Sequence, residues 1–276
     1  MTRPVHTHAE GKPKRKSADP VVAWVRRLKR YRPNLADDTL AALSAMYGVP
    51  TWERVHDPTS ELILTILSAF SSDLGAEKAF DALSRHWPKA GDADLGERVN
   101  RPGWGGGGIG RATPDWSAVE FAQPEELIDV IRPGGLGPQK APRIQAALRA
   151  IREHRGDYSL EFLGLMAPQD ALAWLTAIPG VGRKTASVVL LFSFGMPLLP
   201  VDRHVERVGL RIGLIPPKVT VLQAHDYMAA LVAPERSHEA HVNLITHGRR
   251  TCHAQRPACG RCAIAYRCRF IDPRAP

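Results

Sequence analysis

Apolar residues recur with the spacing of an α-helix along most of the chain. Leu40, Leu43 and Met46 predict a short helix that ends near Gly48. Segments that alternate between apolar and polar residues, as a half-buried strand does, are missing. The pattern therefore predicts an all-α fold. The other predicted helices begin at Pro58 and run to Phe70, or cover residues 74–87, 124–132, 140–154, 168–178, 184–194, 203–213, 219–232 and 237–247.

Two segments lack this period. Residues 1–19 are polar and basic, which predicts a disordered tail. The stretch from about Pro88 to Gln123 contains the glycine-rich run 104–110, which cannot hold a helix. This run lacks the Lys-Ser/Thr ending of a phosphate-binding P-loop, so a surface insertion is the favoured interpretation.

The composition is that of a soluble globular protein, with 44% hydrophobic and 24% charged residues among 276. No apolar run is long enough to span a membrane, and the N-terminus has no hydrophobic signal region. We therefore expect no membrane partner and a cytoplasmic location, with association to the nucleoid if the partner is DNA.

The net charge of +9 resides at the two ends of the chain. Residues 1–20 carry a net charge of +3 and residues 249–276 a net charge of +6, so the segment between them is balanced. Such basic clusters predict a nucleic-acid partner. The N-terminal run is typical of a solvated tail, whereas a folded C-terminal loop would present its arginines together. These are Arg249, Arg250, Arg256, Arg261, Arg267 and Arg269.

The last stretch of the chain holds all four cysteines, spaced C-x6-C-x2-C-x5-C. Four thiols in one short loop indicate a metal site, because disulfide frameworks belong mainly to short, cysteine-rich secreted chains. Tetrahedral zinc and an iron–sulfur cluster both fit. Zinc sites more often have two C-x2-C pairs, so the single pair favours iron–sulfur and leaves zinc open. The ligands would be Cys252, Cys259, Cys262 and Cys268.

A tight turn formed by Pro179, Gly180, Val181 and Gly182 separates two predicted helices, the second of which begins near Arg183. Glycines permit a positive φ and a close approach of another backbone. The N–H groups of the turn and of the following helix start form an anion site. This arrangement is typical of a helix–hairpin–helix, which binds a DNA phosphate without reading sequence. An ordinary corner between two helices is the alternative.

Lys184 and Asp202 are the candidate catalytic residues. Lys184 lies in the first turn of its helix, where the helix dipole disfavours a cation and, with partial burial, favours the amine that a nucleophile needs. A solvated or phosphate-binding lysine is the commoner use of such a position. Asp202 begins another helix, either as its N-cap or as a carboxylate that accepts a proton or stabilises a sugar cation in the same cleft. For His204 a capping or core role is more typical.

Four motifs in this order resemble the endonuclease III family of DNA repair glycosylases, in the helix–hairpin–helix-GPD superfamily. They are PGVGRKTA at 179–186, VDRH at 201–204, HGR at 247–249 and the cysteine loop. The resemblance covers most of the chain from about residue 35. It implies a [4Fe–4S] cluster on the four cysteines, with Lys184 as the catalytic amine and Asp202 as the catalytic carboxylate.

The resemblance also implies two all-α domains with a DNA cleft between them. Residues 53–196 would form a helical barrel that contains the hairpin, at about 174–190, and an insertion at about 90–122. Residues 20–52, as an N-terminal helix, would pack with residues 197–276 in the cluster domain.

The reaction implied by the resemblance begins with a damaged base flipped out of double-stranded DNA. Lys184 would attack C1′ and form a Schiff base, and β-elimination would then nick the strand. We therefore expect a monomeric, bifunctional DNA glycosylase and AP lyase of base excision repair that removes damaged, oxidised pyrimidines. The alternatives are a relative that prefers uracil or mismatched thymine, and a DNA-binding module without catalysis.

Three positions depart from the family pattern or refine it. Phe70 stands where the family usually has glutamine, as either a wedge in the DNA or a core side chain. Leu136 matches the family's second wedge position, and Ile66 replaces the catalytic glutamate of the adenine glycosylases, which argues against that subfamily. Arg249 and Arg261, with the hairpin residues 179–183, are the other expected DNA contacts.

Overall fold

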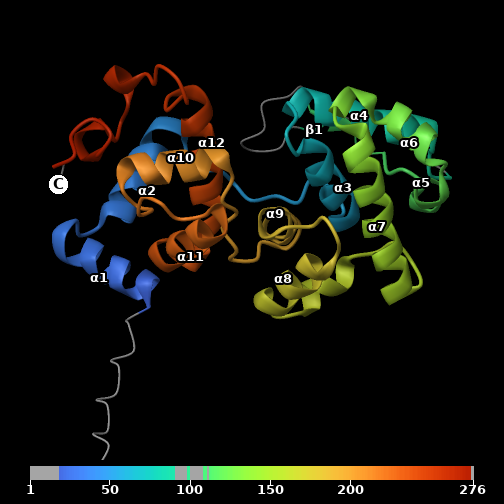
Figure 1. Ribbon diagram of the computed structural model, residues 1–276, viewed down its shortest axis with the longest axis horizontal. Helices are drawn as coiled ribbons and strands as arrows, with labels where there is room; N and C mark the ends of the chain where they lie inside the picture. The colour runs from blue at the N-terminus through green and yellow to red at the C-terminus, as the bar shows by residue number, and fades with distance from the viewer. Residues whose placement is uncertain (1–18, 91–97, 100–107, 111, 275–276) are drawn as a thin grey trace, which may run out of the picture.

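The computed structural model describes residues 19–90, 98–99, 108–110 and 112–274 and is built almost entirely of helices (Figure 1). The predicted tail, apart from Asp19, and about half of the predicted insertion at about 90–122 lie outside these residues. The all-α prediction is confirmed. In the described part of the chain, the strands are one antiparallel pair, β1 (Arg98–Val99) and β2 (Ile109–Gly110). No helix among these residues is long and apolar enough to cross a membrane.

The helices form two groups, each around its own apolar core (Figure 1). The first group joins the N-terminal helices to the C-terminal part of the chain, and its core contains Leu28, Leu43, Val208 and Leu244. Its elements are α1 (Pro20–Tyr31), α2 (Leu35–Tyr47), α10 (Arg203–Ile212), α11 (Val221–Leu231), α12 (Ser237–Arg250) and the 3-10 turns η3 (Pro234–Arg236), η4 (Cys259–Arg261) and η5 (Ala265–Arg267).

The second group contains the middle of the chain, and Leu62, Phe80, Leu148 and Leu190 are completely buried or nearly so in its core. α3 and α9 lie at the centre of this group and pack against each other. Its elements are α3 (Pro58–Ser68), α4 (Asp73–His86), α5 (Trp116–Phe121), α6 (Pro124–Val130), η1 (Arg132–Gly134), α7 (Gly137–Arg155), η2 (Glu161–Leu165), α8 (Pro168–Ala177) and α9 (Arg183–Phe194).

The N-terminal segment is divided into two helices, so the expectation of one helix over residues 20–52 is wrong. Pro33 interrupts it, because the residue before a proline is pushed out of the α region. Asn34 then adopts a left-handed φ of 61° before α2 begins. The break lets α2 pack on α12 while α1 packs on α11.

Helix α3 begins where its sequence predicts. Oδ1 of Asp57 accepts hydrogen bonds from the backbone N–H groups of Thr59 and Ser60, each at 3.0 Å, and so caps the helix. All of its residues except Ser68 are buried. The helix ends at Ser68 rather than at Phe70, whose φ of 53° is left-handed. The difference of two residues matters, because Phe70 lies beyond the end of the helix and its side chain is outside the core.

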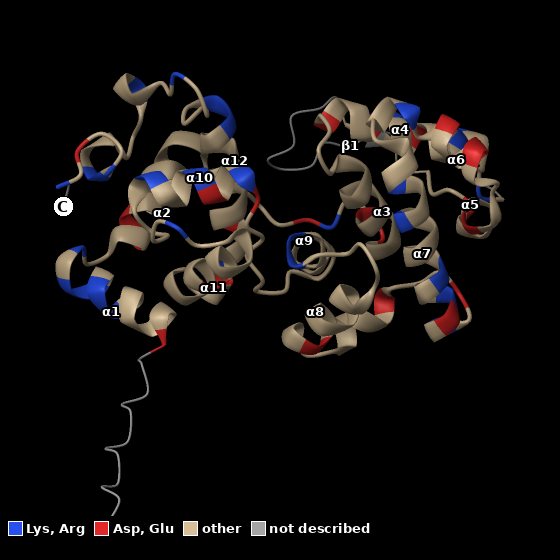
Figure 2. Ribbon diagram, viewed as in Figure 1, with Lys and Arg blue, Asp and Glu red and all other residues tan. Residues whose placement is uncertain are grey.

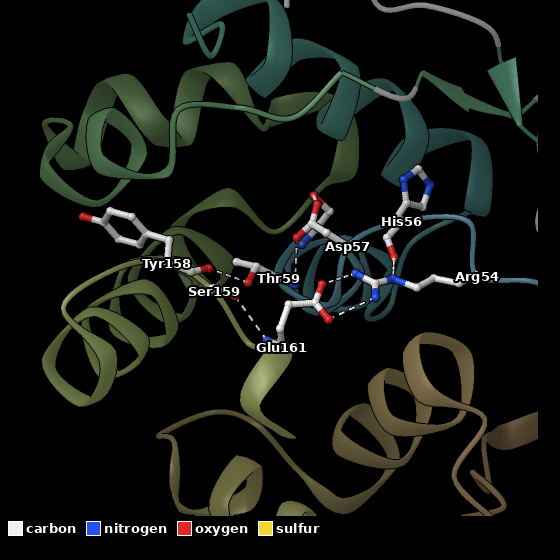
Figure 3. Close-up of polar contacts among 8 residues, drawn as sticks. Arg54, His56, Asp57, Thr59, Tyr158, Ser159 and Glu161 are labelled. Atoms are coloured by element: carbon white, nitrogen blue, oxygen red, sulfur yellow. Dashed lines mark hydrogen bonds and ion pairs between the residues drawn. The ribbon is translucent and has the colours of Figure 1, made fainter. Parts of the chain in front are cut away.

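The chain crosses from the first group to the second through residues 48–57, and polar contacts hold this crossing against η2 (Figure 3). The Arg54 guanidinium binds the Glu161 carboxylate with both nitrogens of its fork and donates from Nε to the His56 carbonyl at 3.0 Å. Within α3, Thr59 Oγ1 donates to the Tyr158 carbonyl at 2.7 Å. The exposed ion pair contributes little to stability, so the buried Thr59 bond is the firmer attachment.

Candidate active site and cysteine-lined cavity

A cleft of about 920 Å³ lies between the two groups of helices. Its walls come from the loop between α3 and α4, the first turns of α9 and α10, and the C-terminal part of α12. Lys184, Asp202, Phe70 and Arg249 all line it. The two candidate catalytic residues, eighteen positions apart in the sequence, therefore face one space.

The turn between α8 and α9 has the geometry of a helix–hairpin–helix. Gly180 adopts a φ of 86°, and a Cβ built on it would lie 2.8 Å from Cγ of Arg143, so both the backbone and the packing require glycine. Val181 is buried, and its N–H donates to the Ile178 carbonyl at 3.0 Å. Gly182 begins α9 without a capping side chain. The first N–H groups of α9 are therefore available to an anion.

Lys184 is the second residue of α9, and its side chain is half-buried in the cleft. The neighbouring Arg183 has a protein partner: its Nη1 lies 2.6 Å from Oδ1 of Asp226 on α11. Pro179 is exposed at the turn. The DNA contact predicted for Arg183 stays a prediction, and a phosphate would have to compete with Asp226.

Asp202 caps α10 and lines the cleft at the same time. Its Oδ1 accepts hydrogen bonds from the N–H groups of His204 and Val205, both at 2.8 Å. The other carboxylate oxygen, Oδ2, takes no part in the cap. Burial by itself raises the pKa of this carboxyl. His241, the Val205 N–H, His204 and Lys184 more than offset that effect and hold the pKa below its ordinary value. The carboxylate is therefore charged at neutral pH.

Two buried histidines hold the backbone that leads into Asp202. His225 accepts the Val201 N–H on Nε2 at 3.1 Å, while its Nδ1 lies 2.9 Å from the Val221 carbonyl. His241 Nδ1 lies 2.9 Å from the Pro200 carbonyl. Burial lowers the pKa of His225, and an unprotonated Nε2 is what the Val201 contact requires. Neither histidine belongs to a recognisable motif, so the sequence alone does not single them out.

Phe70 and Leu136 are exposed apolar side chains on two separate loops. Phe70 is 83% exposed, so its interpretation as a core residue is wrong. Leu136 precedes α7 and is 44% exposed. Both residues have a left-handed φ, 53° and 54°, which is unusual for side chains of this size.

The C-terminal arginines do not form one surface, in contrast to the expectation. Arg267 is largely buried and forms an ion pair with Asp38 of α2. Arg249 crosses the cleft to Asp73 of α4, with nitrogen–oxygen distances of 2.5 and 3.1 Å. Arg261 is exposed and donates to the Arg250 carbonyl. Figure 2 shows basic residues spread over α1, α10, α12 and the C-terminal segment.

All four cysteines line one small apolar cavity. Its other walls include Val208, Ile212, Ile264 and Phe270. Burial raises the pKa of the Cys262 and Cys268 thiols, backbone N–H groups lower it, and the other thiols raise it further. Such thiols become thiolates when a cationic centre binds them.

Nitrogen donors from α10 and α12 contact the sulfur atoms. Arg211 Nη1 lies 3.2 Å from Sγ of Cys252, and His247 Nε2 lies 3.5 Å from Sγ of Cys262. Burial lowers the pKa of His247 to about 4, so it is neutral. The sulfur atoms of Cys252 and Cys262 thus each have a nitrogen neighbour that could orient them as metal ligands.

No family model matches the chain. Curated relatives do. Endonuclease III of Bacillus subtilis is 40% identical over 231 residues, which are 83% of this chain and 90% of the relative. Endonuclease III of Escherichia coli K12 is also 40% identical, over 81% of this chain and 89% of the relative. The chain belongs to the endonuclease III family.

Solved structures of the family have the same fold. A trapped endonuclease III–DNA covalent intermediate superposes with a TM-score of 0.67 at 27% identity, over 87% of this chain and 97% of that chain. A non-covalent endonuclease III–DNA complex gives 0.65 at 28% identity, over 85% and 94%. A thermostable thymine-DNA glycosylase, 17% identical with a TM-score of 0.64 over 89% and 98%, shares the fold alone. Membership of the endonuclease III family makes the protein a DNA N-glycosylase and AP lyase, and damaged DNA its partner.

Proposed function

We propose that Lys184 is the nucleophile and Asp202 the catalytic carboxylate with which this base excision repair glycosylase removes damaged pyrimidines, oxidised ones in particular. The observation that carries the proposal is the shared cleft: both side chains line it, and Asp202 is charged there. The cleft also lies next to the hairpin, whose N–H groups suit a phosphate. Lesion, sugar and phosphate can therefore be bound together.

The chemistry follows from these positions. With the damaged base rotated out of the stack, C1′ reaches the cleft. The charged Asp202 stabilises the positive charge that develops on the sugar as the bond to the base breaks. The Lys184 amine then forms a bond to C1′, and loss of a proton and opening of the sugar give a Schiff base. Removal of a C2′ proton expels the 3′ phosphate, which nicks the strand.

Surrounding residues bind the DNA in this proposal. Pro179–Gly182 and the start of α9 hold a phosphate, and Arg249 and Arg261 contact the backbone. Phe70 and Leu136 enter the stack where the flipped base leaves a gap, because an exposed apolar side chain gains from stacking between bases. Their exposure on loops supports this role.

The cysteine loop is proposed to hold a [4Fe–4S] cluster. The four thiols that line one cavity, together with membership of the endonuclease III family, support this proposal. A bound cluster would fix the loop against α10.

We also propose that the two groups of helices are the two domains, residues 53–196 and residues 20–52 with 197–276. The two separate apolar cores support this division. A monomeric state and a cytoplasmic, nucleoid-associated location stay predictions.

Borohydride trapping tests the proposal. The protein is incubated in borohydride with duplexes that contain an oxidised pyrimidine, uracil, a thymine mismatch or an abasic site. The fraction of DNA in covalent complexes is then measured on denaturing gels. We expect trapping with the oxidised pyrimidine and the abasic site, its loss in Lys184→Ala, and no change in Lys29→Ala, which alters an exposed lysine of α1. Trapping that survives in Lys184→Ala would refute the lysine assignment, and activity on uracil alone would refute the substrate.

A further inference from the structure

Lys140 of α7 is a buried lysine. Its side chain is only 2% exposed, and among the described residues it is the one lysine in the core. Its Nζ donates to two backbone carbonyls, that of Leu67 at 2.6 Å and that of Gly134 at 2.7 Å. Burying an ammonium costs free energy, and the two hydrogen bonds to carbonyls offset part of that cost.

Both carbonyls end an element. Leu67 lies in the last turn of α3, and Gly134 is the last residue of η1. Carbonyls at the end of a helix lack partners within it and attract a cation. Phe70 follows Leu67 by three positions, and Leu136 follows Gly134 by two. One ammonium group therefore links the residues from which the two loops with the exposed apolar side chains begin.

The two loops also share a support. A Cβ on Gly75, in the first turn of α4, would lie 2.8 Å from the Pro133 carbonyl, so η1 packs directly on the helix that follows the Phe70 loop. One turn further along α4, Cβ of Ala79 lies 3.1 Å from where a Cβ of Gly134 would be. A left-handed φ at Phe70 and Leu136 persists only where the surroundings fix it. The hydrogen bonds of Lys140 and the packing of η1 on α4 hold the backbone at these two residues in place.

We propose that Lys140 is a positioning residue, which fixes the Phe70 and Leu136 loops relative to each other so that both side chains enter the DNA as one unit. The inference rests on the proposed wedge role of these two residues. An aliphatic side chain of similar length would fill the same space but would leave both carbonyls without a donor. Burial lowers the pKa of Lys140 to about 8, which shows that the fold retains this group at a cost.

The test is the preference for damaged DNA in Lys140→Met. Binding constants are measured for a duplex with a tetrahydrofuran abasic analogue and for the undamaged duplex. Loss of folded protein lowers both affinities equally, whereas misplaced wedges lower only the first. We expect the ratio of the two affinities to fall about tenfold. Thr59→Val, which removes another buried donor to a loop carbonyl in the same group of helices, should leave the ratio unchanged.

A double-mutant cycle separates positioning from a general structural effect. If Lys140 acts through the two wedges, Lys140→Met should have little further effect on the ratio in a Phe70→Ala/Leu136→Ala background. Lys140→Gln, which keeps an amide donor, should give an intermediate ratio and serves if the methionine variant does not fold.

An unchanged ratio in the folded Lys140 variants, or an equal fall in the background without wedges, would overturn the inference. The proposed function fails separately, through a wild-type protein that neither prefers the abasic analogue nor forms a trapped complex.

Discussion

At the scale of single residues, the proposed chemical role of Asp202 is compatible with its structural role, because the helix cap uses only one carboxylate oxygen. Asparagine caps a helix as well as aspartate does but carries no charge. We therefore expect Asp202→Asn to keep the melting temperature within a few degrees and to lower single-turnover base excision by about 10²–10⁴-fold. Trapping on a preformed abasic site should fall less, because no base has to leave.

The matched control is Asp115→Asn, which changes the N-cap of α5 outside the cleft. It should leave excision unchanged. Equal losses in the two variants, or full activity of Asp202→Asn, would contradict the role of Asp202.

His225 gives a pH dependence that can be measured. Burial lowers the pKa of His225 in the folded protein below its ordinary value of 6.5. As the pH falls below about 6.5, the unfolded chain therefore binds more protons at this residue than the folded protein does. The stabilisation from His225 is thus complete above about pH 6.5 and is lost at lower pH. The difference in unfolding free energy between wild type and His225→Gln should be constant from pH 7 to 8 and shrink towards pH 5.5. A constant difference over the whole range would show that His225 is not buried in its neutral form.

Sequence reasoning at this scale depended on motifs. Lys184, Asp202 and the cysteines stand within recognisable patterns, and the structure brings the first two into one cleft and the cysteines into one cavity. Lys140, His225 and His241 do not, because their partners are backbone carbonyl and N–H groups that come close only in the folded chain. The sequence also leaves two roles open for Phe70, because whether an apolar residue after a helix turns inward depends on its φ, which the sequence does not show.

At the scale of elements, the hairpin turn depends on Gly180. A left-handed φ costs an alanine about 1–2 kcal/mol, and its Cβ would also press on Arg143. We expect Gly180→Ala to destabilise the protein by at least this amount in chemical denaturation and to weaken binding to undamaged DNA.

Gly182→Ala is the matched control, since Gly182 has an extended backbone with a φ of −88° and open space around its Cβ position. It should change stability by less than about 1 kcal/mol. Similar effects at the two glycines would mean that the turn geometry is not what fixes the hairpin.

The helices themselves were predictable because a long apolar face repeats every three to four residues. The errors fall where this signal is short or interrupted. α5 is six residues long and lies in the segment predicted to be irregular, yet a capping Asp115 and the buried Trp116 and Val119 establish it. The break between α1 and α2 was missed although Pro33 marks it.

At the scale of the whole molecule, the fold packs the two N-terminal helices against the C-terminal part of the chain. α1 and α2 share a core with α10–α12, and Arg267 of the cysteine loop reaches Asp38. Which arginines remain exposed could not be predicted from the sequence, because their acidic partners lie far away along the chain. Part of the positive charge of the C-terminal segment is therefore used in ion pairs within the protein. DNA contact by the other arginines stays a prediction.

The cysteine loop yields a prediction about the purified protein. We expect iron and acid-labile sulfide in equal amounts, with the visible absorption of an iron–sulfur cluster. Cys262→Ser should lose the cluster and unfold at lower temperature, because a bound metal group stabilises only the folded loop. Ala263→Ser, an exposed neighbour, should keep both properties. Stoichiometric zinc in a colourless protein would contradict the proposal.

The central claim is that Lys184 forms the covalent bond to the sugar, and peptide mapping tests it most directly. The complex trapped on damaged duplex DNA is digested with protease and nuclease, and the modified peptide is sequenced by mass spectrometry. The account predicts a reduced sugar adduct on the side chain of Lys184. An adduct on another lysine or on the N-terminal amine would contradict it.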